Sequence, residues 1–230
     1  MGVEMFHHGE ILQALSLLCQ GAVRLRSDAE LEDTLQVGSN RLFPAGTEVE
    51  VTDDSGVTER RTVQGQVGLE QVVLTEALTG SYHVAKNAVV KLVQTGVPEH
   101  AWIGQGKPAV TPRPMPASFP CVVVAPVSME QPLKEGTNRA YTQEYLSSVY
   151  YVRRRLEGEV EEQRFQSEVG GLFNLLMGDP YLGGTCWYGQ VTRVDYRCSE
   201  EPALHDRGSA VRVARLEVLA KRSEVWGVAE

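Results

Sequence analysis

The chain has 230 residues, a formal net charge of −8 at pH 7 and a pI near 5.2. That length suffices for one large domain or two ordinary ones, and either can bury enough apolar surface to fold unaided. The acidic balance argues against a protein that binds nucleic acid through phosphate contacts, because such binding needs a clustered basic surface and the one basic run is Arg153-Arg154-Arg155. An acidic surface instead suits a protein that must stay soluble, or one past which DNA slides without sticking.

The sequence carries no recognisable targeting, membrane or metal-binding segment. No signal peptide precedes the first predicted helix, and no apolar run approaches the roughly 20 residues of a membrane span. The four cysteines, Cys19, Cys121, Cys186 and Cys198, lie far apart, without a CxxC pair or a histidine spacing that suits zinc. We therefore expect a chain made in the cytoplasm, with reduced core cysteines and no metal or other cofactor.

The first predicted elements are helical. Leucine and isoleucine at helical spacing predict a helix over His8–Gly21. A short second helix is predicted over Ser27–Leu35, because Ser27 and Glu30 have the spacing of a capping box. Residues 1–37 are thus expected to form a helical segment, and packing of this segment on the C-terminal domain is one of two layouts left open.

Alternating apolar residues predict short strands after this segment. Thr47–Val51 and Val57–Val63 flank the turn Asp53–Gly56 and predict a hairpin. Further short strands are expected over Gln71–Thr75, Ser81–Val84 and Ala88–Val93. A small closed barrel of the SH3-like or oligonucleotide-fold type over residues 38–95 is favoured, because closure removes exposed strand edges. The scattered charges of its predicted strands and their one aromatic ring, Tyr82, do not favour nucleic-acid binding.

Prolines mark the middle of the chain. Residues 96–118 are predicted to be a stiff, extended linker between two folded units. Beyond the linker, Phe119–Pro126 is predicted to be a short strand bounded by prolines, and Val127–Arg139 a polar loop. Ala140–Arg155 is rich in tyrosine and valine, which predicts a longer strand.

The clearest pattern in the chain follows. Apolar residues at helical spacing predict a helix over Glu159–Gly178, which Gly178 and Pro180 end. The corner Tyr181–Gly184 leads into a strand that runs to Cys198. In the final strand, Ala210–Lys221, the apolar residues change faces, which predicts a bulge or burial on both faces. The order β-β-α-β-β predicts a helix on an antiparallel sheet for residues 119–226, and an α+β fold overall.

This back half carries a family resemblance. The succession of FPCVVVAP, a tyrosine-rich strand, a helix, YLGGTCWYGQVTRVDY and VRVARLEVLAKR is similar to that in the tail-terminator (tail-completion) proteins of long-tailed bacteriophages. The resemblance implies a scaffold of a strand that begins at Phe-Pro, a helix, a Leu-Gly-Gly corner and a valine-rich last strand. The predicted barrel resembles those of head-to-tail stopper and tail proteins of such phages, so it is either an insertion in a terminator or a separate module.

The same resemblance implies a function and partners. Six copies would form a ring at the head-tail junction of the virion that caps the tail tube protein and meets the head connector or stopper protein. DNA would pass through without sequence-specific binding, and no membrane would be involved. The polar loop, the basic run and the corner are the expected subunit interface, with Met129, Leu133, Lys134, Glu135, Arg139, Arg153, Arg155, Tyr181 and Leu182 as its candidate residues.

No enzyme is expected, because the sequence contains no GxSxG, GxxxxGKS, HExxH or DxDxDG pattern and its five histidines have no catalytic spacing. The alternative to a structural virion protein is an accessory protein whose barrel binds a small ligand or a polymer. The mass of the purified complex distinguishes the two hypotheses.

Overall fold

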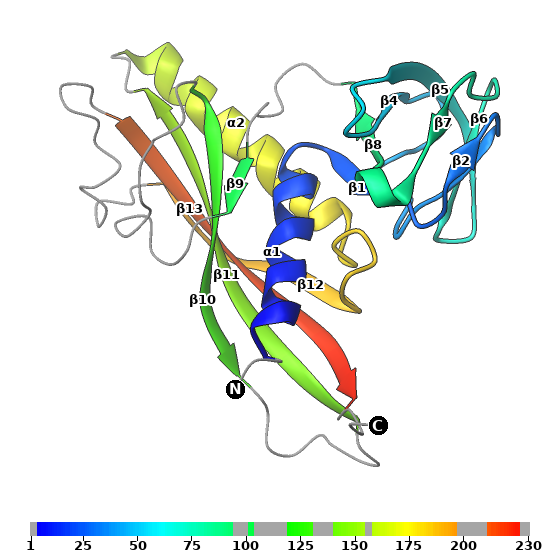
Figure 1. Ribbon diagram of the computed structural model, residues 1–230. Helices are drawn as coiled ribbons and strands as arrows, with labels where there is room; N and C mark the ends of the chain where they lie inside the picture. Colours follow the sequence, from blue (N-terminus) through cyan, green and yellow to red (C-terminus); the bar gives the residue numbers. More distant parts are fainter. Residues whose placement is uncertain are drawn as a thin grey trace.

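The computed structural model describes residues 4–93, 101–103, 119–130, 140–154, 158–196 and 211–225. The fold is α+β, and all but one of the strand pairs in its sheets are antiparallel. Figure 1 shows two units joined by the helix α1 (Glu4–Cys19): a front unit of short strands, residues 22–93, and a back sheet of long strands that α1 and α2 (Glu159–Gly178) cover on one face.

Six strands of the front unit form one curled sheet in the order β1-β8-β4-β5-β6-β3. Its strands are β1 (Ala22–Arg24), β3 (Thr34–Gln36), β4 (Glu48–Thr52), β5 (Thr58–Val67), β6 (Gln71–Leu74) and β8 (Val89–Leu92). The sheet curls until its two edge strands meet, where Leu25 forms an antiparallel bridge with Val37. A second pair, β2 (Ala29–Glu30) with β7 (Ser81–Tyr82), lies beside it and is followed by the 3₁₀ turn η1 (Val84–Lys86).

The hairpin predicted in this unit is confirmed. β4 pairs with β5 from Glu48 opposite Thr62 to Thr52 opposite Thr58. In the turn between them, the Asp53 carboxylate accepts the Ser55 amide N–H at 2.8 Å, and Gly56 adopts φ +79°, a conformation that favours glycine.

The prediction of a second helix over Ser27–Leu35 is wrong. Those residues form β2 and β3, which pair with β7 and β6. Instead of capping a helix, this stretch is bound to a distant segment: the Asp28 carboxylate accepts the Val84 amide N–H at 2.7 Å. Long-range strand pairing therefore overrides the local capping pattern, and the N-terminal segment contributes strands to a sheet that was expected to begin at residue 38.

Glu59 on β5 is the polar centre of the front unit. Its carboxylate accepts the amide N–H groups of Thr79 and Gly80 and the Tyr82 hydroxyl, and it forms an ion pair with Arg61. Burial raises the pKa of the Glu59 carboxyl, but the hydrogen bonds from Thr79, Gly80 and Tyr82 outweigh burial, so the net pKa is lowered. Burial and the Glu59 charge raise the pKa of Tyr82 to about 12. This carboxylate ties β5 to β7 only while it is ionised.

We expect Glu59→Gln to lower the free energy of unfolding by about 1–3 kcal/mol, because an amide cannot serve all these donors. The folded-state pKa of Glu59 is depressed, so its contribution is fully present above the ordinary glutamate pKa of 4.5 and is lost as pH falls through the lower folded-state value. Denaturant unfolding below pH 5 should therefore show a weaker acid dependence for Glu59→Gln than for the wild type. The matched control is Glu76→Gln on the exposed surface of the same unit, and an equal effect of both variants would contradict the assignment.

The back sheet has the order β12-β13-β11-β10-β9. Its strands are β9 (Ala101–Ile103), β10 (Cys121–Glu130), β11 (Ala140–Arg154), β12 (Tyr188–Asp195) and β13 (Val211–Val225). The predicted order β-β-α-β-β is confirmed for β10, β11, α2, β12 and β13. β11 and β13 pair along fifteen residues, from Ala140 opposite Val225 to Arg154 opposite Val211, a ribbon of roughly 50 Å.

Two predictions for the middle of the chain need correction. Three residues of the predicted linker form β9, which pairs parallel with β10, while 96–100 and 104–118 lie outside the described residues. The predicted loop over Val127–Arg139 is wrong at its start, because β10 continues to Glu130. Pro126 suggested the end of the strand, but a bulge between Pro126 and Ser128 allows pairing with β11 to resume.

The back sheet is buried on both faces at one end. For the final strand, this agrees with the prediction of burial on both faces. Leu216, Val218 and Ala220 of β13 join the core beneath the helices. Val211 and Val213 instead belong to a second apolar cluster on the opposite face, with Cys121, Val123, Ala125, Tyr150 and Val152. The register shift lies not in β13 but in its partner β12, between Val191 and Arg193.

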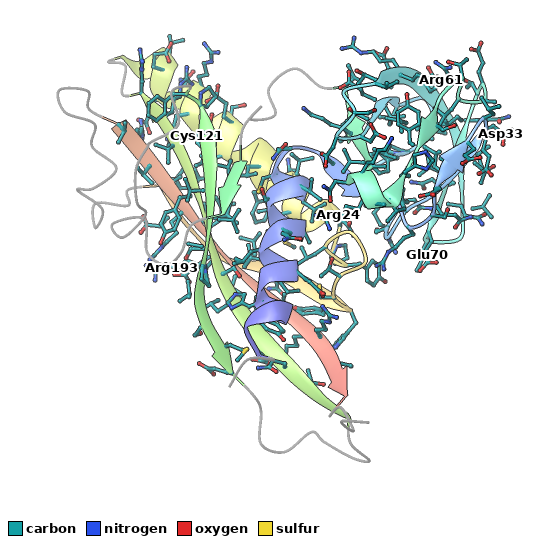
Figure 2. All side chains as sticks on the ribbon, viewed as in Figure 1. Arg24, Asp33, Arg61, Glu70, Cys121 and Arg193 are labelled. Atoms are coloured by element: carbon teal, nitrogen blue, oxygen red, sulfur yellow. The ribbon has the colours of Figure 1, made fainter. Side chains whose placement is uncertain are left out.

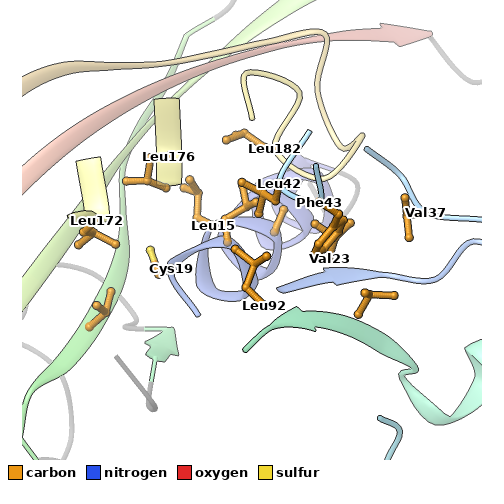
Figure 3. Close-up of a cluster of buried hydrophobic side chains, with 14 of the residues drawn as sticks. Leu15, Cys19, Val23, Val37, Leu42, Phe43, Leu92, Leu172, Leu176 and Leu182 are labelled. Carbon is orange, nitrogen blue, oxygen red and sulfur yellow. The ribbon is translucent and has the colours of Figure 1, made fainter. Parts of the chain in front are cut away.

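The helix α1 is buried between the two units. Figure 3 shows Leu15 and Cys19 with Leu172 and Leu176 of α2 on one side and Val23 and Phe43 of the front unit on the other. The polar side of α1 also contacts the back sheet. His8 Nε2 lies 3.2 Å from Ser147 Oγ, and the centre of the His8 ring lies 5.3 Å from that of Tyr145 in a tilted arrangement. One core therefore runs from the front unit through α1 to the back sheet.

Candidate functional site

The corner between α2 and β12 is built on one buried carboxylate. Asp179 is fully buried, and its carboxylate accepts the amide N–H of Tyr181 at 3.1 Å and of Gly183 at 2.8 Å. The next residues take left-handed conformations, with φ +48° at Leu182 and +66° at Gly183. Asp179 thus ends α2 and turns the chain sharply, which is why this Leu-Gly-Gly sequence forms a rigid corner.

The corner lies directly against the front unit. A Cβ atom on Gly38 would lie 1.8 Å from the Gly183 carbonyl oxygen, and one on Gly184 would lie 2.3 Å from the Gly38 carbonyl oxygen. The guanidinium of Arg26 donates to the Gly184 carbonyl at 2.9 Å. We call this contact of Gly38, Gly183 and Gly184 the glycine joint, and it permits a backbone approach that no side chain would allow.

Two of the residues predicted for the subunit interface belong to contacts within the chain. Leu182 is fully buried in the core, packed over Gly189 of β12. Tyr181 lies beneath Arg41 of the front unit, with the guanidinium carbon 5.7 Å from the ring centre. The corner therefore joins the two units of one chain, and its Leu182 is not at the surface.

Arg153 is also buried, which corrects its expected place on an interaction surface. Its guanidinium donates to the Glu168 carboxylate at 2.7 Å and to Glu161 at 3.0 Å. The Tyr151 hydroxyl donates to the same Glu168 oxygen at 2.7 Å, and burial together with that bond raises the pKa of Tyr151. This network fixes α2 on β11.

The other predicted interface residues are divided between the core margin and undescribed segments. Met129 lies on β10, half-buried and packed against the core. Leu133, Lys134, Glu135, Arg139 and Arg155 lie outside the described residues. For these five residues the predicted interface stays a prediction.

Sequence reasoning missed a cleft beside the glycine joint. It has a volume of about 640 Å³ and lies between α1, β1, the corner and β13. Its polar lining includes Arg24, Arg26 and Arg222, and Glu10 is the one acidic residue among its described lining residues. Glu10 forms an ion pair with Arg222. In a chain of net charge −8, this cleft is locally basic. Only the three-dimensional structure reveals it, because Arg222 is nearly 200 residues away from Arg24 and Arg26 in the sequence.

The described cysteines are buried, and the described side chains form no metal-binding cluster. Cys19, Cys121 and Cys186 are free and buried, and burial raises the pKa of the last two thiols to about 12, so these cysteines are core residues as predicted. Cys198 lies outside the described ranges. Within those ranges, no group of three or more His, Cys, Asp or Glu side chains could hold a metal ion. None of the described helices is long and apolar enough to span a membrane.

Comparison of the sequence with protein-family models and with curated proteins gave no match.

Proposed function

We propose that this protein is a structural component of a bacteriophage head-tail junction, a tail terminator whose copies form a ring at the end of the tail tube. The observation that carries the proposal is the path of the chain from α2 through the Leu-Gly-Gly corner into β12, on an antiparallel sheet whose last strand is β13. This is the scaffold that the sequence resemblance implies. Six copies, contact with the tail tube protein and contact with the head connector or stopper belong to the same proposal.

Open strand edges support a role in assembly. β12 forms one edge of the back sheet, and beyond the short β9 no described residue pairs with the outer edge of β10 at Ala125–Glu130. Val127, on that stretch, is 53% exposed. Unpaired edges with exposed apolar side chains are suited to strand addition from another chain. An acidic chain at a DNA passage would also repel the phosphate backbone, which suits DNA that must move.

The front unit is proposed to be an SH3-like barrel that serves contacts with neighbouring proteins. The support is the curl of the six-stranded sheet and the bridge between Leu25 and Val37 at its edges. The glycine joint and the burial of α1 between the units favour the layout in which the barrel is an insertion in a terminator, because a separate module would not share one core with the back sheet.

The oligomeric mass tests the ring. Light scattering on size-exclusion fractions of the full chain should give a single species of six times the 25.3 kDa chain mass. A monomer that persists when tail-tube ends are present would contradict the proposal. It would leave the alternative of an accessory binding protein.

A further inference from the structure

We propose that the basic cleft at the glycine joint binds the acidic turn Glu30–Asp33 of a second copy, so that subunits associate head to tail. The inference rests on the proposed ring and names the contact that builds it.

The cleft presents arginines from two directions. Arg24 and Arg26 are two residues apart on and just after β1, so both extend to the same side of that strand, and both are exposed. Arg26 is held by its bond to the Gly184 carbonyl, and Arg222 reaches the cleft from β13. No side chain in the described ranges pairs with the guanidinium of Arg24. The cleft is thus preorganised for carboxylate groups, which arginine binds in a bidentate manner.

Part of the cleft wall is apolar. Ala14, Leu17 and Leu18 of α1 line it together with Val84, a large apolar side chain that is 41% exposed. A ligand for this cleft would therefore combine carboxylates with an aliphatic group. A free inorganic anion has no apolar group, so it would leave the apolar wall of the cleft exposed to water.

The turn between β2 and β3 has this combination. Leu31 is 65% exposed, the highest value among the large apolar side chains of the front unit that the structure describes, and it adopts φ +56°, which is uncommon for a residue other than glycine. Glu30 and Glu32 flank it, both exposed, and neither carboxylate has a partner among the described residues. Asp33 adds a third charge and accepts the Thr34 hydroxyl. A leucine thus lies between carboxylates in the link from β2, which pairs with β7, to β3, which pairs with β6.

The cleft and the turn lie on different sides of the front unit. Figure 2 shows Arg24 on the side that faces α1 and Asp33 on the side farthest from α1. One chain therefore cannot fill its own cleft with its own turn. A contact between two different surfaces is heterologous, and its repetition closes into a ring when the rotation between copies permits. The opposite charges would also fix the sense in which copies join.

Charge reversal on the full-length protein tests the contact. Arg24→Glu alone, and the double variant Glu30→Lys with Glu32→Lys, should each weaken self-association roughly a hundredfold in sedimentation velocity, because the first cancels the net positive charge of the cleft and the second makes the turn basic. An equimolar mixture of the two variants should associate again, since the unchanged acidic turn of the Arg24→Glu chain then meets the unchanged basic cleft of the double variant, and the introduced lysines meet the glutamate introduced at position 24. All these positions are exposed, so the thermal midpoint of the subunit should stay unchanged. The matched controls are Arg60→Glu and Glu70→Lys, exposed charges outside both surfaces.

The outcomes separate this inference from the ring itself. Restored association in the mixture, with neither variant associating alone, supports the contact. A wild-type oligomer that Arg24→Glu leaves intact overturns the contact and leaves the ring standing. A wild-type protein that remains monomeric at all concentrations, with and without tail-tube ends, overturns both.

Discussion

Gly38→Ala should lower the free energy of unfolding by about 3 kcal/mol, the upper end of the usual cost of overpacking. The added methyl group would lie 1.8 Å from the Gly183 carbonyl oxygen and 3.1 Å from Arg26 Nε. The Gly183 oxygen belongs to a backbone that Asp179 holds, so the corner cannot move aside without breaking those bonds. We also expect cooperativity to fall, because the front unit would separate from the corner before the back sheet unfolds.

Gly170→Ala is the matched control for this substitution. Gly170 lies in α2, and a Cβ atom there would meet no atom within 4 Å. Alanine should therefore stabilise the helix by up to about 1 kcal/mol through its higher helix propensity. Urea unfolding, monitored by both circular dichroism and tryptophan fluorescence, measures the two variants. Equal midpoints for Gly38→Ala and the wild type would show that the glycine joint does not hold the units together.

Arg153→Met should cost about 3 kcal/mol, because it removes the buried cation that pairs with Glu168 and leaves that carboxylate with the Tyr151 hydroxyl and the exposed Arg164. Methionine keeps an apolar stem of similar length, so the loss reports the charge and its bonds rather than a cavity. Glu161, the second partner of Arg153, is partly exposed, so we expect the loss in free energy of unfolding to lie at the lower end of the range for broken buried ion pairs.

Arg164→Met provides the comparison, since Arg164 contacts the other oxygen of the same Glu168 carboxylate at 3.1 Å. Its side chain is 62% exposed, and such surface pairs within one helix contribute about 0.3–0.5 kcal/mol. Thermal unfolding of both variants should separate them clearly. A loss from Arg164→Met as large as that from Arg153→Met would contradict the view that the buried cation fixes α2 on β11.

The elements that could be predicted are those with local signals. The apolar stripe and the Gly178-Asp179-Pro180 stop define α2 within a few residues of sequence, and the Asp53–Gly56 turn defines the hairpin of β4 and β5. β2 and β3 could not be predicted in this way. A capping-box spacing at Ser27 and Glu30 favoured a helix, and only pairing with strands 35 to 53 residues later decides otherwise.

Less of the candidate site than of the fold could be predicted from the sequence. The Leu-Gly-Gly corner stood out in the sequence, but spacing cannot tell whether a corner meets another subunit or the same chain, and Leu182 proved to be buried. Gly38 carries no signal of its own, since its importance comes from a backbone contact with residues 183 and 184. The basic cleft has the same character, because Arg24 and Arg222 come together only in the fold.

Negative-stain electron microscopy of the purified protein mixed with tail tubes tests the proposed ring directly. We expect rings of one diameter with six-fold symmetry, seen free and seated at one end of each tube, and loss of both with Arg24→Glu. Tubes with bare ends, together with a protein that shows no rings at any concentration, would contradict it.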